Sequence, residues 1–223
     1  MKKKIRITVD CVMVLLLPLL MAYSLVGEAA HEYLGIGMFL LFIAHHILNI
    51  AWWKHIFRGK YTPFRILGTT VNLALALIML TLPISGMILS RHVFLFLHFN
   101  GTSTARTVHL LASYWGLVLM SFHAGMHGQM IAKRLLRKNK STLLKIISYI
   151  NISLLVAFGV FALKRKNIAD YLFLRSQFVL IDFSQPAILA VVDYLLVSMM
   201  FMIVGYYIAK FTNCNFVKKH YSS

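Results

Sequence analysis

Long apolar stretches occupy almost the whole of this 223-residue chain and restrict the folds open to it. Hydrophobic residues make up 60% of the sequence, charged residues make up 13%, and the mean hydropathy is +0.76. Soluble domains rarely have this composition, and about 20 apolar residues in a helix are enough to cross a bilayer. The sequence therefore predicts an all-α membrane protein with six transmembrane helices, at residues 5–26, 31–53, 66–90, 107–131, 143–163 and 187–210. Little sequence is left for a separate soluble catalytic or nucleotide-binding domain.

The basic residues are sorted by loop, which predicts the orientation of the chain. A net charge of +17 would raise the question of nucleic acid in a soluble protein, but cytoplasmic loops of membrane proteins are rich in Lys and Arg. If both termini are cytoplasmic, 17 of the 23 basic residues lie on the inner side: Lys2, Lys3, Lys4, Arg6, Lys54, Arg58, Lys60, Arg65, Lys133, Arg134, Arg137, Lys138, Lys140, Lys145, Lys210, Lys218 and Lys219. We therefore predict a multi-pass protein of the cytoplasmic (plasma) membrane that binds no nucleic acid. The outer cluster Lys164–Lys166 is the exception to this pattern.

The first segment and the two cysteines carry weaker signals. Lys2–Lys4 precede an apolar run as in a secretory signal, but the run is longer than a typical signal core, so we expect it to be retained as a helix. Cys11 and Cys214 lie far apart, and the chain has no CxxC or CxxCH motif. This pattern predicts free thiols, without a disulfide, zinc site, iron–sulfur cluster or covalent haem.

Two pairs of histidines occur at the same spacing within the apolar stretches. His31 and His45 lie in the second stretch, and His109 and His123 lie in the fourth, each pair 14 residues apart. Fourteen residues make nearly four helical turns, so each pair shares one helix face, with its members about 21 Å apart along the axis. With the N-terminus inside, both stretches run from outside to inside and are parallel. His31 is then level with His109 near the outer face, and His45 is level with His123 deeper in.

This arrangement favours haem as the ligand. Imidazole is costly in hydrocarbon, so histidines inside a membrane segment are functional candidates, and bis-histidine ligation of iron is a common use for them. A four-helix bundle formed by the first four segments can hold such cofactors between facing helices. We therefore expect two b-type haems, one held by His31 and His109 and the other by His45 and His123. His46 and His127 remain alternative ligands at the inner level, and His55, His92, His98 and His220 fall at segment ends or in loops.

Several other residues can be interpreted either as part of a haem site or as structural residues. Gly35 and Gly116 lie near the histidine faces and would leave space for a porphyrin, although glycine in membrane helices also permits close helix packing. Arg91 and Arg106 flank the outer ends of the third and fourth segments, within reach of haem propionates. Asn49 shares a face with His45.

Acidic residues and one connecting segment are also open to two interpretations. Asp10 and Asp193 are candidates for proton handling or for a buried polar contact, and the second reading is the more common one. Residues 167–183 form either a connecting loop or an amphipathic helix at the surface.

Four sequence strings resemble a known family. They are HE at residue 31, HHxLN at 45, SGxxLSR at 85 and HxLASYWG at 109, within residues 31–67, 84–94 and 106–128. In this order they are similar to the flavinylation-associated membrane cytochromes, and the resemblance covers about residues 1–131. It implies a di-haem four-helix core in which His31, His45, His109 and His123 match the ligand positions. It also implies an extracytoplasmic flavoprotein partner, since this chain carries no flavin-attachment motif of its own.

The combined prediction is a di-haem b-type cytochrome that transfers electrons across the membrane, between a quinone pool and an extracytoplasmic flavoprotein or another redox protein. Residues 1–131 would form the haem-binding bundle, and residues 132–223 would add two membrane helices. Such a chain is an electron-transfer subunit rather than a stand-alone enzyme, and haem b and quinone are its expected cofactors. The alternative is a cofactor-free membrane transporter or scaffold whose histidines serve protons or metal ions.

Overall fold

The computed structural model describes residues 2–97, 99, 102–135, 142–179 and 186–221, and it is helical in every regular element of these ranges. The elements are α1 (Lys2–Met21), α2 (Tyr23–Val26), α3 (Glu28–Leu48), α4 (Ile50–Lys54), α5 (Pro63–Leu89), η1 (Leu95–Leu97), α6 (Ser103–Leu135), α7 (Thr142–Arg165), α8 (Ile168–Leu172) and α9 (Ala187–Tyr221). The all-α prediction is confirmed. His98, the side chains of Cys214 and His220, and those of the basic residues between 133 and 140 lie outside the described part.

Local sequence signals explain where the first long helices begin and end. Gly27 precedes α3 with a φ of 76°, a conformation that favours glycine. Asn49 ends α3, and its side-chain amide donates to the His45 carbonyl at 2.8 Å. Thr62 caps α5 by accepting from the Arg65 backbone N–H at 3.2 Å, and Pro63 occupies the first helical position. Asn49 therefore contacts the backbone of His45 and not its ring.

Four helices are long and apolar enough to cross a membrane: Glu28–Leu48, Pro63–Leu89, Thr142–Arg165 and Ala187–Asn213. α1 and α6 are long as well, but their composition is more polar. α1 begins with Lys2–Lys4 and carries Arg6 and Asp10, while α6 carries both His109 and His123 together with three serines and one tyrosine. The chain therefore has the helices of a multi-pass membrane protein, and six spans stay a prediction.

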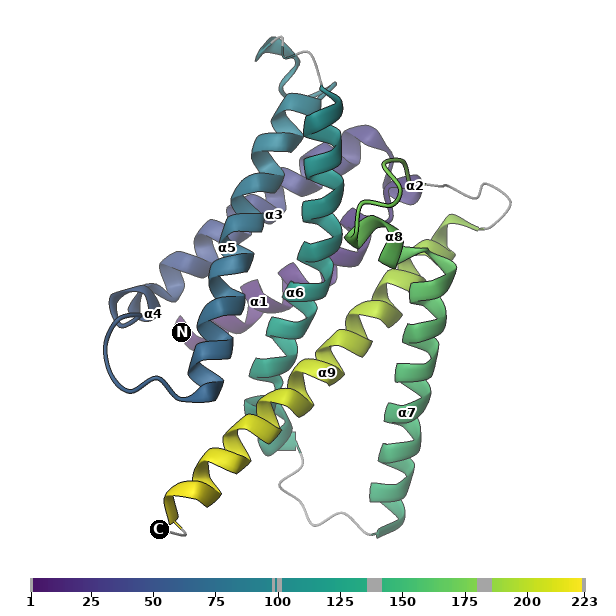
Figure 1. The fold of residues 1–223 in the computed structure, drawn as a ribbon. Helices are drawn as coiled ribbons and strands as arrows, with labels where there is room; N and C mark the ends of the chain where they lie inside the picture. The colour runs from purple at the N-terminus through teal and green to yellow at the C-terminus, as the bar shows by residue number, and fades with distance from the viewer. Residues whose placement is uncertain (1, 98, 100–101, 136–141, 180–185, 222–223) are drawn as a thin grey trace.

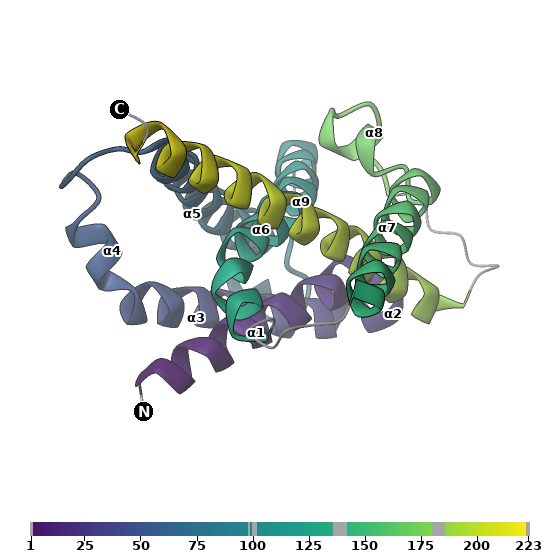
Figure 2. The ribbon, with the colours of Figure 1, turned by 90° about the horizontal axis from the view of Figure 1, so that it is seen from below.

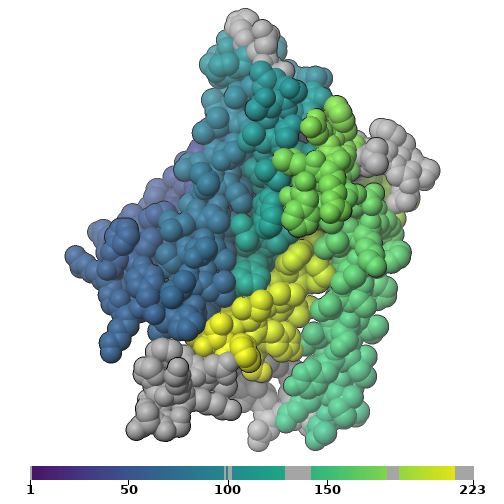
Figure 3. Space-filling view, viewed as in Figure 1, coloured from purple at the N-terminus to yellow at the C-terminus, as the bar shows by residue number. Residues whose placement is uncertain are grey.

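Large apolar side chains on the outside of these helices agree with a lipid environment. Leu77 and Ile84 of α5 and Phe158 and Phe161 of α7 are among the exposed hydrophobic residues. In water such residues would favour association, whereas in a bilayer they face lipid tails. The space-filling view shows α9 between α6 and α7, with α8 above them (Figure 3).

The histidine-bearing helices α3 and α6 run in the same direction. Both lead from the end of the molecule that carries α2 toward the end that carries the C-terminus (Figure 1). α6 packs along α5 and α9, whereas α3 packs on α1 and α5. Within the described residues α3 and α6 have no extended backbone packing with each other, so side chains make the contact between them. The view along the bundle shows α1 and α3 on one side of α6 (Figure 2).

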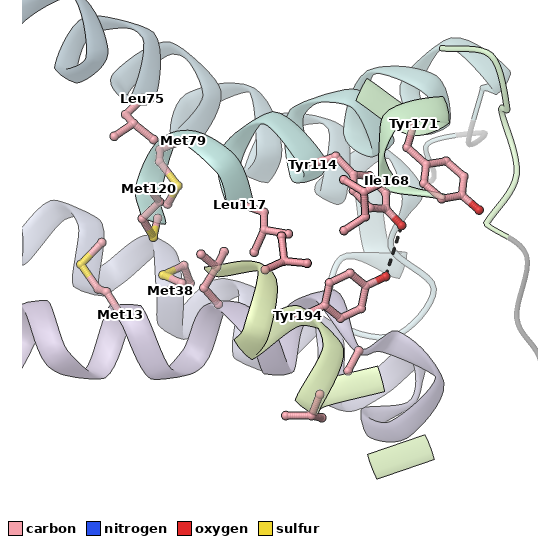
Figure 4. Close-up of a cluster of buried hydrophobic side chains, with 14 of the residues drawn as sticks. Met13, Met38, Leu75, Met79, Tyr114, Leu117, Met120, Ile168, Tyr171 and Tyr194 are labelled. Atoms are coloured by element: carbon pink, nitrogen blue, oxygen red, sulfur yellow. Dashed lines mark hydrogen bonds between the residues drawn. The ribbon is translucent and has the colours of Figure 1, made fainter. Parts of the chain in front are cut away.

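The hydrophobic core is shared by the two parts of the chain that the sequence divides at residue 131. Leu117 of α6, Ile168 of α8 and Val197 of α9 belong to one cluster, and their side chains are fully buried. Tyr114 stacks on Tyr171 with ring centroids 4.6 Å apart (Figure 4). The last helices are therefore packed into the bundle, and their separation as a domain stays a prediction.

α8 is part of this core and does not form the amphipathic surface helix considered for residues 167–183. Its Ile168 and Tyr171 are buried, and Trp115 donates its indole N–H to the Leu172 carbonyl at 3.1 Å. The hydroxyls of Tyr114 and Tyr194 lie 3.3 Å apart in the same region (Figure 4). Tyr114 and Trp115 thus join α6 to α8 and α9. Residues 180–185 lie outside the described part.

Asp193 forms a buried ion pair with the basic cluster Lys164–Lys166 at the end of α7. Its side chain in α9 is fully buried and contacts the guanidinium of Arg165 at the end of α7, with the Lys166 ammonium 3.7 Å away. Of the two readings of Asp193, the buried polar contact is the one observed. Two of the three cations of the Lys164–Lys166 cluster therefore face a carboxylate.

Glycines allow α6 and α9 to cross at close range. A Cβ atom on Gly125 of α6 would collide with the Met202 carbonyl of α9, and one on Gly205 of α9 would collide with the Phe122 carbonyl of α6. Both obstacles are backbone atoms, which cannot rotate away as a side chain can. The crossing therefore depends on two reciprocal glycines.

We expect Gly125→Ala to destabilise the folded protein by about 1–3 kcal/mol, the usual cost of overpacking a close contact. Gly128→Ala on the same helix is the matched control, because its new methyl group would meet only the Tyr206 ring, at 3.9 Å. Thermal unfolding of both variants in one detergent checks the prediction. Equal melting temperatures for the two variants would contradict it.

Candidate functional site

The structure brings His31 of α3 and His109 of α6 together, as the matched spacing predicts. Their ring centroids are 6.2 Å apart, and the ring planes are inclined by 67°. At metal–imidazole bond lengths of about 2.0 Å, two imidazoles on opposite sides of one metal ion have centroids about 6 Å apart. This separation is thus suitable for two axial ligands of one iron.

His109 is held in one orientation by α5. The Ser85 hydroxyl lies 2.8 Å from the Thr81 carbonyl and 3.0 Å from Nδ1 of His109. Because a hydroxyl has a single proton, donation to the carbonyl leaves Ser85 to accept from an Nδ1–H of His109. The lone pair of His109 is then on Nε2. Gly86 lies beside the same ring, since a Cβ atom added there would be 3.5 Å from the imidazole.

The imidazole of His31 lies against that of His109, and one of its two nitrogens lacks a hydrogen-bond partner among the described residues. Its Nδ1 is buried and has no hydrogen-bond partner among the described residues, although the imidazole is also hydrogen-bonded to the backbone of Leu20. Tyr23 packs edge-on against the imidazole, with centroids 5.4 Å apart. A buried polar nitrogen without a partner is costly in a protein interior, and binding a ligand at this ring is one way to offset that cost.

The inner level gathers four histidines and one carboxylate. Nδ1 of His45 lies 2.7 Å from the Asp10 carboxylate of α1, and Nδ1 of His46 lies 3.0 Å from the Phe42 carbonyl. Both partners are acceptors, so both rings direct an Nδ1–H toward them, and Nε2 is the nitrogen of each ring that remains for a ligand. On α6, the rings of His123 and His127 have centroids 4.7 Å apart.

The inner histidines of α3 and α6 lie within electrostatic range of each other. His123 interacts with His45 and His46, and His127 interacts with His45 and Asp10. His46 also packs against Phe42 and Trp53, with centroids 4.2 and 5.6 Å away. His127 is exposed, whereas His123 is half-buried. The choices between His45 and His46, and between His123 and His127, stay predictions.

Flexible side chains fill the bundle between the two levels. Met13, Met38, Met79 and Met120 come from α1, α3, α5 and α6 and converge with Leu75 (Figure 4). Met38 lies between His31 and His45 in sequence, and Met120 lies between His109 and His123. Methionine is unbranched and adapts its shape at low cost, so this filling can rearrange around a bound group.

The predicted glycines have different surroundings. A Cβ atom on Gly35 would have no neighbour within 4 Å, so the space beside it is open, and its role toward a porphyrin stays a prediction. Gly116 is buried against α5, where a Cβ atom would be 3.3 Å from Ile78 and 3.8 Å from Leu82. Of the two readings of Gly116, close helix packing is the one that its contacts support, because α5 occupies the space expected for a porphyrin edge.

The two outer arginines are exposed and differ in their partners. The Arg91 side chain lies 3.5 Å from the Glu28 carboxylate, and His92 is near the same carboxylate at 4.0 Å. Arg106 lies on the first turns of α6. Their role toward propionates stays a prediction, and Arg91 would have to exchange Glu28 for that partner.

Glu32 joins the two outer sequence strings in space. Its carboxylate accepts from the Ser90 hydroxyl at 2.7 Å and from the backbone N–H groups of Arg91 and Val93 at 2.7 and 2.8 Å. HE at residue 31 and SGxxLSR at 85 therefore meet, because Ser85 and Gly86 contact His109 while Ser90 and Arg91 contact Glu32. This string is the sequence signal that contains Ser85 and Gly86, whose roles the sequence analysis missed.

Comparisons with known proteins give no match from which a role for the site could be inferred. No family model, no curated protein and no solved structure matches the chain. Within the described part of the chain, no group of three or more His, Cys, Asp or Glu side chains is arranged to hold a metal ion.

Proposed function

We propose that this protein is a di-haem b-type cytochrome that carries electrons across the cytoplasmic membrane. The observation that carries the proposal is the pair His31 and His109, with ring centroids 6.2 Å apart on two parallel helices. The orientation of His109 by Ser85 and the unpartnered Nδ1 of His31 support it. A porphyrin supplies four equatorial nitrogens, so two imidazoles are all that the protein must add.

The second haem is assigned to the inner level. His45 and His123 each lie 14 residues after their outer counterparts, and Asp10 holds Nδ1 of His45, which leaves Nε2 of that ring for the iron. His46 and His127 are the alternative ligands. Haem supplies one-electron redox chemistry, and two axial imidazoles leave no open position for oxygen or substrate, which favours electron transfer.

Six spans and two cytoplasmic termini complete the proposed topology. α1 and α6 join the four apolar helices as spans, since α6 lies between α5 and α9 and the histidines that lower its hydropathy would face the cofactor. The N-terminus, the α4–α5 connection and the end of α9 lie toward one end of the molecule (Figure 1). Most basic residues belong to that end, which we place in the cytoplasm.

The partners follow from the absence of other redox groups in the sequence. A quinone of the membrane pool is proposed as one electron-exchange partner, and an extracytoplasmic flavoprotein or another redox protein as the other. The resemblance of residues 31–67, 84–94 and 106–128 to the flavinylation-associated cytochromes supports the flavoprotein. The lipid bilayer, which would surround the apolar helices, is the remaining proposed partner.

Purification of the full chain in detergent tests the proposal. We expect red protein with about two haems per chain by the pyridine haemochrome assay and a reduced-minus-oxidised spectrum of the b type. Colourless protein from haem-replete cells would contradict it. Zinc binding or solute movement by such protein would instead support a transporter that uses its histidines for metal ions or protons.

A further inference from the structure

The two histidine levels differ in the partner that holds Nδ1 of the proposed ligand. At the outer level, Nδ1 of His109 lies 3.0 Å from the neutral hydroxyl of Ser85. At the inner level, Nδ1 of His45 lies 2.7 Å from the carboxylate of Asp10. The first partner comes from α5 and the second from α1, so the difference is built by separate helices.

This difference changes how strongly each imidazole donates to a metal. A carboxylate that accepts from Nδ1–H raises the basicity of Nε2, and the more basic ligand stabilises the more positive, ferric state of iron. A neutral hydroxyl that already donates to the Thr81 carbonyl polarises the ring less. Hydrogen bonds to axial ligands are one of the means by which a protein sets a haem potential.

We propose that Asp10 is a positioning residue that makes the His45 site the lower-potential site of the two. The inference rests on the proposed function. It takes His45 as the inner ligand. The ring of His46 is held by the neutral carbonyl of Phe42 at 3.0 Å, so a site built on His46 would not respond to Asp10 in this way. An electron on this protein is then more stable at the outer, His31–His109 level.

Redox titration of the haem-loaded full chain tests the inference through potentials rather than activity. We expect wild type to have two midpoint potentials and His109→Ala to retain only the lower one. Asp10→Asn should raise the lower midpoint and leave the upper one unchanged, and Asp10→Glu should restore it. Asp170→Asn is the control, because Asp170 lies in α8 and its carboxylate pairs with the exposed Arg175.

The outcomes separate this inference from the proposed function. Asp10→Asn protein that has lost the inner haem would show only the upper midpoint. Recovery of the inner haem in Asp10→Glu would then also support Asp10 as the residue that positions His45. Two unchanged midpoints in Asp10→Asn, or a shift of the upper one, would overturn the inference while the cytochrome assignment stands. Wild-type protein without haem would overturn the proposed function itself.

Discussion

His109→Ala should lower the haem content from about two per chain to about one, with the inner haem retained. The variant removes the ligand from α6 at the outer level, and His31 alone cannot complete a bis-histidine site. Nothing at this level offers a second imidazole among the described residues, because the other histidine nearby, His92, lies beside Glu28 on the surface. The pyridine haemochrome assay, normalised to protein, measures the loss.

His92→Ala is the matched control for this loss. It removes an exposed imidazole from the same end of the molecule, near the Glu28 carboxylate at 4.0 Å, and should leave two haems bound. His45→Ala should remove about one haem as well, from the inner level. If His109→Ala retained both haems, the outer ligand assignment would be wrong, whatever the colour of the wild type.

Sequence reasoning succeeded where a feature depends on one helix alone. Apolar runs located α5, α7 and the candidate span Ala187–Asn213 of α9 to within about three residues, because a lipid-facing helix must be apolar along its length. The predicted end of the second run, at residue 53, lies beyond Leu48, where α3 ends. The 14-residue spacing also predicted that His31 and His109 would be level. That prediction needed only helical periodicity and a common direction for two helices.

Contacts between helices could not be derived in the same way. Gly116 lies seven residues after His109 and therefore shares its face, as the sequence indicates, but that face meets α5 at Ile78 and Leu82. The side chain of His109 extends far enough from the same face of α6 to bring its ring to 6.2 Å from the ring of His31, measured between centroids. Helical phase gives the direction of a side chain on its own helix, and it does not identify the helix that stands opposite.

Polar partners from distant helices were missed for the same reason. Asp10 reaches His45 across 35 residues of sequence, and Ser85 reaches His109 across 24. Both were visible as polar residues in apolar stretches, but their partners depend on packing. The carboxylate of Asp193 is the clearest case, because its contact with Arg165 explains a basic cluster that the positive-inside rule does not.

Arg165→Met should destabilise the fold by about 3 kcal/mol, because it leaves the buried carboxylate of Asp193 with incomplete compensation. The Asp193 side chain is 0% exposed, and the remaining cation, Lys166, is 3.7 Å away. Removing one member of a buried ion pair costs more than the pair itself contributes, since the uncompensated charge stays desolvated. Thermal or denaturant unfolding in detergent, at equal haem loading, measures the change.

A double variant and an exposed ion pair serve as controls for this prediction. Arg165→Met combined with Asp193→Leu removes both buried charges and should recover most of the lost stability, because an apolar pair of similar volume can replace a buried ion pair. Arg175→Met is the control, since Arg175 and Asp170 are 72% and 44% exposed and 3.9 Å apart, and its effect should stay below about 0.5 kcal/mol. If the double variant were as unstable as Arg165→Met alone, the loss would come from the cation–π contact between the Arg165 guanidinium and the Phe161 ring, and not from the uncompensated carboxylate.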